Sequence, residues 1–275
     1  MARKRVINDS FSDMRGFDVT QDPNLVATLA RGLQVLECLK HKNSQFMGNK
    51  EIAEITGLSK PAVSRITYTL SKFGYIKYVA SLSKYTLGTS VLTAAYPVLA
   101  NMKIRQIARP LMQELANEIG GVVSLGVRHG AQMLFVESCA SATSVTPVIA
   151  GIGARIPLLA TAMGRAYLCG LSLTERQELL DQLAGLEHFS EEEVETNVSE
   201  AVKQFDKWGF CLAKKGLVKE TRSVGVPLLA KVNEEAFSFN CGIPAFRLSP
   251  NQLENDVGPR LLNLVRSVER TMGLN

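Results

Sequence analysis

The apolar positions in the first third of the chain recur every three or four residues, which is the spacing of an amphipathic helix. From Leu25 onward, one such stripe is formed by Val26, Leu29, Leu33 and Leu36. We expect a first helix whose stripe packs against the rest of a small domain. Positions 1–24 show no hydrophobic period, and we expect a flexible basic tail there.

Two further helices are expected to follow, joined by a tight turn. Asn49 is a suitable N-cap for a short helix over 50–56 that ends at Gly57, and Ser59 is a suitable cap for a third helix with Pro61 in its first turn. The expected buried stripe of this third helix consists of Val63, Ile66, Leu70 and Phe73. Its other face carries Lys60, Ala62, Ser64, Arg65, Tyr68 and Lys72. This arrangement is typical of a helix-turn-helix.

A short hairpin is expected directly behind these helices. Gly74 ends the third helix, and residues 75–79 and 84–87 have the composition of strands separated by a polar turn. A hairpin in this position is the wing of a winged-helix module, over residues 25–89. A three-helix structural domain could share the apolar spacing, but it would not need the basic outer face.

Residues 90–120 have a nearly continuous helical pattern interrupted by Pro97 and Pro110. We expect a linker helix over 90–106 and a second domain over 107–275. In that domain, alternating residues predict strands over 123–127 and 133–136 with a turn at His129 and Gly130.

The second domain is expected to mix strands and helices. Thr161 is a suitable cap for a helix over 162–169. The other expected elements are a helix opened by a capping box at 174–177, a helix through Val198, Val202 and Phe205, strands over 223–229 and 237–243, and a last helical region from Ser249 and Pro250 that breaks at Gly258 and Pro259. This order indicates the α+β fold class.

The charge is divided unevenly between the two parts of the chain. Positions 1–89 hold 13 Lys and Arg against 7 Asp and Glu, whereas positions 90–275 hold 18 against 19. A basic module attached to a neutral one is typical of a protein that binds a polyanion, although a basic surface without such a partner would give the same balance.

The composition excludes several classes of protein. The chain has 275 residues, 46% of them hydrophobic, with no apolar run long enough for a membrane helix, so we expect no membrane partner. Its five cysteines form no CxxC pair, which argues against a disulfide scaffold or zinc ribbon and favours a reducing cytoplasm.

The motifs of common enzymes are incomplete. Gly151 and Gly153 lack the third glycine of a dinucleotide fingerprint, and no Walker-type lysine loop is present. Residues 121–126 miss the spacing of a nucleophile elbow, so Ser124 is interpreted as a strand residue facing a pocket or solvent. Residues 191–193, three glutamates, are interpreted as a solvated helix face. We therefore expect no enzyme activity, no metal and no cofactor.

A basic helix face of this kind has a direct chemical interpretation on a duplex. The phosphates of double-stranded DNA would attract Lys60, Lys72, Lys77 and Lys84. Arg65 can donate two hydrogen bonds to guanine, while Ser64, Thr67 or Tyr68 can reach base edges or phosphates.

The chain resembles the IclR family of bacterial transcriptional regulators. The matching stretches are RGLQVL at 31–36, Ile52 with Ala53, GLSKPAVSR at 57–65, Leu70, GYI at 74–76 and, most characteristic of the family, GARIPLLATAMGRA at 153–166. The resemblance implies a winged-helix domain, a linker helix and an effector domain resembling the GAF fold. It also implies homodimers or homotetramers on an operator, with a small organic acid, aromatic or short-chain, modulating control of a catabolic operon.

The resemblance also implies where an effector would bind. By position in the motif, Ala162 and Met163 match effector-lining residues, and Ser223, Asn240 and Gly242 match others on two facing strands. A helix N-terminus with free amides suits an anion. The alternative for each residue is ordinary packing. The acidic stretch usual before Ser223 is replaced by Lys214, Lys215 and Gly216, and the pocket position often held by an acid falls near Ala213.

Two rival functions follow from the same sequence. The first is a small-molecule enzyme with a basic accessory domain, which would need a catalytic constellation in the second domain. The second is an architectural DNA binder without a ligand, against which the capped helix at Thr161 argues.

Overall fold

The computed structural model describes residues 24–40, 46–142, 151–184, 191–213 and 221–274. The chain divides into two compact units, Met1–Asn101 and Met102–Asn275. Residues 1–23 of the tail expected over 1–24, and the segment with Lys214, Lys215 and Gly216, lie outside the described residues. Within the described part, no helix is both long enough and apolar enough to cross a membrane.

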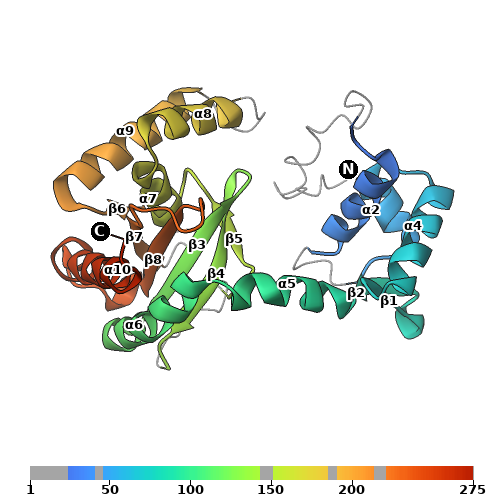
Figure 1. Cartoon of the computed structure of the whole chain (residues 1–275), viewed down its shortest axis with the longest axis horizontal. Helices are drawn as coiled ribbons and strands as arrows, with labels where there is room; N and C mark the ends of the chain where they lie inside the picture. Colours follow the sequence, from blue (N-terminus) through green and yellow to red (C-terminus); the bar gives the residue numbers. More distant parts are fainter. Residues whose placement is uncertain (1–23, 41–45, 143–150, 185–190, 214–220, 275) are drawn as a thin grey trace. The chain divides into compact units, whose positions relative to one another are not determined.

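The first unit has the order of elements that the sequence predicts. These are α2 (Ala27–Cys38), α3 (Asn49–Thr56), α4 (Lys60–Lys72), β1 (Ile76–Val79), the short 3-10 helix η2 (Ala80–Leu82), β2 (Lys84–Leu87) and α5 (Ser90–Ala100) (Figure 1). Strands β1 and β2 pair antiparallel. The winged helix-turn-helix prediction is confirmed.

The helix starts in this unit were predicted with mixed success. Ser59 caps α4 by accepting a hydrogen bond from the amide of Ala62 at 3.4 Å. Asn49 is the first residue of α3 rather than its cap, so the predicted cap position was wrong by one residue. Gly48 occupies the cap, and its amide donates to Glu51 Oε2 at 2.8 Å.

The core of the first unit uses a different face of α2 from the one expected. Val26, Leu29 and Leu33 are 64%, 62% and 48% exposed. The buried core residues are Val35, Cys38, Leu39, Met47, Ile52, Val63 and Ile76. This helix is apolar on more than one face, and its C-terminal half packs on α3 and α4, which selects the face with Val35 and Cys38. Phe73 was also wrongly expected to be buried: it is the C-cap residue of α4 and is 71% exposed.

The linker region breaks at a different place from the two prolines. Helix α5 ends at Ala100, and α6 (Lys103–Ile119) begins after Met102, which has an extended backbone. Pro97 and Pro110 both lie inside their helices. An interior proline removes one amide donor and crowds the preceding turn, so each of these helices tolerates the loss of one backbone hydrogen bond at its proline.

The second unit is a six-stranded antiparallel sheet in the order β5-β4-β3-β8-β7-β6. Its strands are β3 (Val122–His129), β4 (Gln132–Ala140), β5 (Arg155–Pro157), β6 (Cys211–Leu212), β7 (Thr221–Pro227) and β8 (Phe237–Pro244). Its other elements are α7 (Ala162–Gly170), α8 (Leu173–Ala184), α9 (Glu191–Trp208), η3 (Ala245–Arg247), the π-helix η4 (Leu253–Val257) and α10 (Gly258–Met272). Helices α6 and α10 cover one face and α7 the other, with α9 packed on α7 (Figure 1).

The local predictions for this unit largely agree with the structure. The hairpin turns at Gly130, and Thr161 caps α7 by accepting from the Gly164 amide at 3.2 Å. The capping box of α8 lies two residues earlier than expected, between Ser172 and Glu175. Residues 258 and 259 begin α10 rather than break it, and the short strand β6 was not predicted.

Candidate functional site

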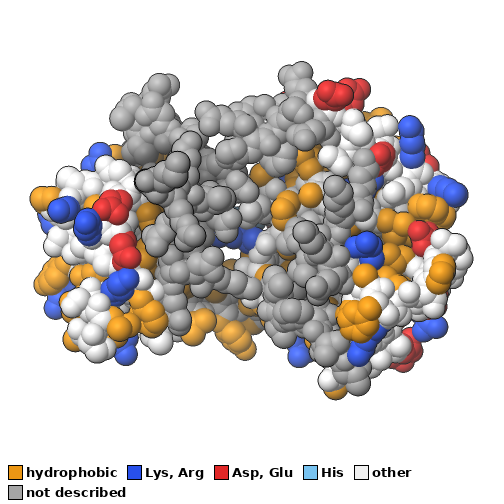
Figure 2. Space-filling model, turned by 180° about the vertical axis from the view of Figure 1, so that it is seen from behind, with side chains coloured by type: hydrophobic (Ala, Val, Ile, Leu, Met, Phe, Trp, Pro, Cys, Tyr) orange, Lys and Arg blue, Asp and Glu red, His pale blue; other side chains and the backbone are white. Residues whose placement is uncertain are grey.

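One face of α4 gathers most of the residues predicted to contact DNA. Lys60, Ser64, Arg65, Tyr68 and Lys72 are all exposed, while Val63 is fully buried in the core on the other side. The Lys72 ammonium lies 5.3 Å from the centre of the Tyr68 ring, a cation–π contact that holds both side chains on this face. Figure 2 shows Lys and Arg side chains beside exposed hydrophobic ones on the surface of this unit.

Thr67 does not belong to that face. Its side chain is fully buried, and its hydroxyl lies 3.0 Å from the Val63 carbonyl and 3.3 Å from Asn49 Oδ1. It therefore ties α4 to α3 instead of pointing outward. Position 67 falls one helical turn after Val63, so helical periodicity alone places it toward the core, and its hydroxyl is satisfied there.

The two lysines of the wing differ in whether their charge is paired. Lys77 on β1 is exposed. Lys84 on β2 lies 3.1 Å from Glu51, so its charge is paired with α3 and is partly neutralised. This pair connects the wing to the helix-turn-helix.

In the second unit, the start of α7 rests directly on the sheet. Ala162 and Met163 are fully buried, and a Cβ atom added to Gly225 of β7 would lie 2.2 Å from the Ala162 carbonyl oxygen. The first intrahelical hydrogen bond runs from the Arg165 amide to the Thr161 carbonyl. The amides of Ala162 and Met163 precede it, which is where a helix attracts anions.

A row of small polar residues crosses the sheet from this helix start. Ser138, Ser124, Asn240 and Gly225 are successive register partners on β4, β3, β8 and β7. Ser238, two residues before Asn240, donates its hydroxyl to the Met163 carbonyl at 3.0 Å, so this set of alternate residues faces α7. Gly242 and its partner Ser223 lie on the same face, two residues farther along. The structure thus brings all five predicted effector residues to one region.

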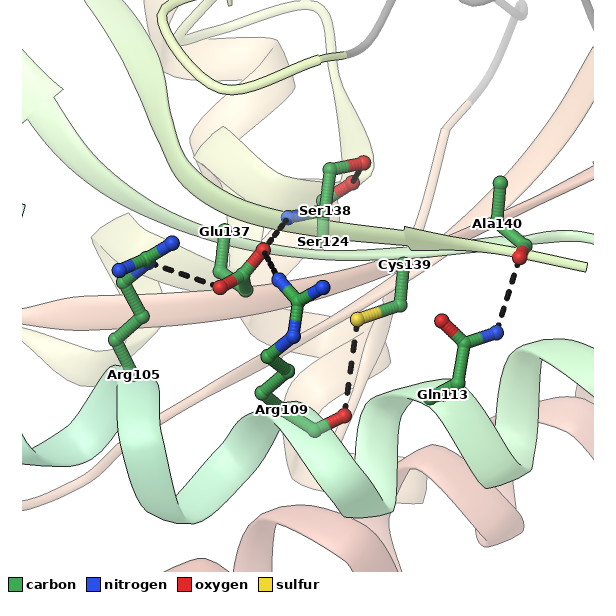
Figure 3. Close-up of polar contacts among 8 residues, drawn as sticks. All are labelled: Arg105, Arg109, Gln113, Ser124, Glu137, Ser138, Cys139 and Ala140. Carbon is green, nitrogen blue, oxygen red and sulfur yellow. Dashed lines mark hydrogen bonds and ion pairs between the residues drawn. The ribbon is translucent and has the colours of Figure 1, made fainter.

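Ser124 and Ser138 extend this region beyond the five predicted residues. Their hydroxyl oxygens are 3.1 Å apart. Figure 3 shows the two side chains next to each other. Ser124 was interpreted as facing a pocket or solvent, and it is almost fully buried. Ser138 was not singled out. Each of these serines stands among mostly apolar residues in its strand. That exception to the apolar pattern is the signal in the sequence that could have identified both.

The opposite face of β4 carries a charge that sequence reasoning missed. Glu137 is fully buried, and its carboxylate lies 2.9 Å from Arg105 Nε and 2.9 Å from Arg109 Nη1 of α6 (Figure 3). It also accepts from the Ser138 amide at 3.0 Å. A glutamate inside an apolar strand is rarely buried without cationic partners, and that was the available signal. Helix α6 is thereby fixed to the strand that carries Ser138.

A separate cavity lies beside the second half of α7. Its volume is about 410 Å³, and Arg128, Tyr167, Glu178 and the ion pair of Glu175 with Lys231 are among its lining residues. Burial raises the pKa of Tyr167, an effect that Arg128 partly offsets. The hydrogen bonds from Lys231 and Ser172 hold the pKa of Glu175 at about 2. This strongly charged lining lacks the apolar character of a typical small-molecule site.

Two family models together cover most of the chain. The model of the IclR helix-turn-helix domain matches residues 28–80, and the model of the bacterial transcriptional regulator IclR C-terminal domain matches residues 96–270. The chain belongs to the IclR family of bacterial transcriptional regulators. The fold, the helix-turn-helix and the effector-type domain described above are those of the family.

Individual IclR proteins agree with this assignment. The crystal structure of an IclR family transcriptional regulator from Brucella abortus is 32% identical, covers 96% of this chain and 99% of its own, and superimposes with a TM-score of 0.81. The HTH-type transcriptional regulator TsaQ1/TsaQ2 of Comamonas testosteroni is 26% identical over 90% of this chain and 89% of its own. An IclR homolog from Microbacterium hydrocarbonoxydans, solved with 4-hydroxybenzoate, is 16% identical over 87% and 99%, with a TM-score of 0.66.

The relatives are regulators of transcription and not enzymes. The described residues of this chain include no group of three His, Cys, Asp or Glu side chains that could hold a metal ion. Because the relatives are regulators, the interpretation as an enzyme with a basic accessory domain is set aside.

Proposed function

We propose that this IclR-family regulator binds an operator through α4 and the wing and changes its affinity when a small organic acid binds at the start of α7. Residues 25–89 would form the DNA-binding domain, 90–106 (α5 with the first residues of α6) the linker, and 107–275 the effector-binding and oligomerisation domain. The observation that carries the proposal is the exposed cationic face of α4, opposite a helix face buried in the core.

On the DNA side, each exposed residue of α4 has a role that its chemistry supports. Arg65 would donate to a guanine edge, and Ser64 and Tyr68 would reach base edges or phosphates. Lys60, Lys72 and Lys77 would contact phosphates and make affinity depend on salt. Thr67 is left out because it is buried, and Lys84 contributes less because it is paired with Glu51.

A binding titration tests this half of the proposal. Arg65→Ala should lower affinity for the natural operator by roughly 1 to 3 kcal/mol, measured by fluorescence anisotropy at fixed salt. Arg31→Ala removes the same charge from an exposed position on α2 and is the matched control. Equal losses in both variants would contradict base reading by Arg65.

On the effector side, the ligand would be a carboxylate held by the amides of Ala162 and Met163. Ser223 and Asn240 would orient it with neutral donors, Gly242 would leave room for it, and Ser124 and Ser138 would form the far end of the site. The 4-hydroxybenzoate complex of a distant IclR homolog supports an aromatic acid as one candidate. A catabolic operon is the target that such an effector favours.

Calorimetry with candidate aromatic and short-chain acids, 4-hydroxybenzoate among them, tests the site. Asn240→Ala should weaken binding of an acid that the parent binds, because Asn240 is half-buried in the row beside Gly225. A bulky replacement of Ala162 should abolish the response while operator binding persists. Asn263→Ala, at an exposed position of α10, is the control. Unchanged ligand affinity in both site variants would refute the placement.

We further propose a homodimer or homotetramer in the bacterial cytoplasm, where the operator is. Helix α5 has no charged residue, and it exposes Leu92 at 69%, Tyr96 at 71% and Val98 at 58%. An exposed apolar helix suits an interface with a second copy. Ultracentrifugation of the parent and of Tyr96→Glu tests this, since a monomeric parent would overturn it.

A further inference from the structure

Two cysteine sulfurs lie in contact at the far end of α7. Cys169, the penultimate residue of the helix, and Cys211, the first residue of β6, have their Sγ atoms 3.7 Å apart. A disulfide bond is about 2.05 Å long, so closing the pair needs an approach of roughly 1.7 Å. Both thiols are free.

The two thiols differ in access. Cys169 is half-buried, whereas Cys211 is fully buried among Ala166, Ala201 and Phe205. The Cys211 sulfur lies 3.5 Å from the Ala201 carbonyl, which accepts its hydrogen while Cys169 is a neutral thiol. A small oxidant would therefore meet Cys169 first.

The two thiols also differ in acidity. A hydrogen bond from the Cys211 thiol lowers the pKa of Cys169. Burial opposes this effect, and the charges of Arg176 and Arg165 support it, so the pKa of Cys169 lies below its ordinary value. That hydrogen bond and burial raise the pKa of Cys211. The thiolate is the reactive form, so Cys169 has the character of the attacking residue and Cys211 that of the resolving one.

A buried arginine holds the two elements together. The side chain of Arg165, one turn before Cys169, is 2% exposed. It donates from Nη1 to the carbonyl of Leu212, next to Cys211, at 2.7 Å, and its Nη2 lies 3.5 Å from Glu200. This contact fixes β6 against α7 and places a desolvated cation near the thiol pair.

We propose that Cys169 and Cys211 are a modification site that hydrogen peroxide converts to a reversible disulfide. The Cys169 thiolate attacks one peroxide oxygen, which breaks the O–O bond, releases hydroxide and leaves a sulfenic acid. The Cys211 sulfur then attacks the Cys169 sulfur, its proton leaves with the departing hydroxyl as water, and the S–S bond forms. Overall, two thiols lose two hydrogens and one peroxide is reduced to two waters.

The disulfide would restrain the helix that carries the proposed effector residues. Cys211 pairs in register with Gly225, and Gly225 lies against the Ala162 carbonyl. The bond would thus anchor the end of α7 to β6 while its start rests on β7. This consequence for ligand binding rests on the proposed function, whereas the disulfide itself does not.

Peptide mapping of the full chain tests the sulfur chemistry. The reduced protein is treated with hydrogen peroxide, alkylated with N-ethylmaleimide and digested with trypsin without reductant. Residues 166–176 and 208–214 each contain one cysteine, so the expected product is one cross-linked pair of these peptides. The intact mass should fall by about 2 Da and return with dithiothreitol. A sulfinic acid at Cys169 without a cross-link, or a disulfide elsewhere, would overturn the proposal.

Cysteine variants test whether the disulfide restrains α7 against β6. The bond would close a loop of about 40 residues, so peroxide should raise the unfolding midpoint of the parent by several degrees, reversibly with dithiothreitol. Cys169→Ser and Cys211→Ser should show no such rise. Cys139→Ser keeps the pair and should behave as the parent. An equal rise in Cys169→Ser would overturn the assignment.

A ligand measurement separates the two proposals. If the reduced parent binds 4-hydroxybenzoate, the oxidised parent should bind it with altered affinity. The affinity of Cys169→Ser for 4-hydroxybenzoate should not change on oxidation. A cross-link that leaves this affinity unchanged would overturn the coupling. If none of the candidate acids binds the reduced protein while the cross-link still forms, the proposed effector site fails and the modification site stands.

Discussion

Gly225 of β7 lies so close to Ala162, the first residue of α7, that a Cβ atom on the glycine would stand 2.2 Å from the alanine carbonyl oxygen and 2.8 Å from the Met163 amide nitrogen. The neighbouring position Gly242 has more room, since a Cβ there would meet only the Thr221 methyl group at 3.6 Å. The two glycines occupy the same face of the sheet but have different physical roles.

Gly225→Ala should therefore push α7 away from the sheet and lower the free energy of unfolding by about 3 kcal/mol, because two backbone atoms would have to move. Gly242→Ala should leave stability nearly unchanged while filling part of the proposed effector site. Chemical denaturation of both variants checks this. Equal stabilities would contradict the close approach.

The buried carboxylate of Glu137 should be sensitive to loss of its partners. Arg109 is 58% exposed, so Arg109→Ala should cost only about 1 kcal/mol, whereas removing Arg105 as well should cost about 3 kcal/mol because the carboxylate is then buried without a cation. Gln113→Ala removes one hydrogen bond from α6 to the Ala140 carbonyl and is the control. Additive, equally small losses would show that Glu137 does not need the arginines.

On α4, the residues that stabilise the fold should differ from those that bind DNA. Thr67→Val keeps the shape of the side chain but removes its hydroxyl, and we expect a loss of about 1 kcal/mol in unfolding free energy. Ser64→Ala changes an exposed side chain and should weaken operator binding without affecting stability. Thermal melting and anisotropy on both variants decide between these effects. A destabilised Ser64→Ala would contradict the assignment.

The pair of Glu175 with Lys231 predicts an acid-range titration. Its hydrogen bonds lower the pKa of Glu175 to about 2, so the pair stabilises the folded state above the ordinary glutamate pKa and loses that contribution as pH falls through about 2. Lys231→Met should move the pKa upward, though not fully, because Ser172 still donates to the carboxylate. NMR chemical shifts of the Glu175 carboxyl carbon report this pKa. Lys203→Met is the control and should leave the pKa of Glu175 unchanged.

The presence of most helices, the wing and the β3–β4 hairpin was predictable because their causes are local, although several helix starts were misplaced by one or two residues. A cap such as Thr161, a turn at Gly130 and the three-to-four spacing of apolar residues all act within a few positions. The effector residues came from the resemblance to the family, Ala162 and Met163 through the segment at 153–166 and the other three through two later strands, rather than from local physics. The errors also have local origins: α2 has apolar residues on more than one face, and spacing could not choose between Val26 and Val35.

The sequence alone determined the kind of protein, because a basic winged helix followed by a capped helix of the IclR type can be recognised from short segments. Only the tertiary structure decided which side chains act together. The partnership of Glu137 with α6, the row from Ser138 to Gly225 and the contact of Cys169 with Cys211 depend on strand register and helix placement. Those arise from packing between residues far apart in the chain, which local patterns do not specify.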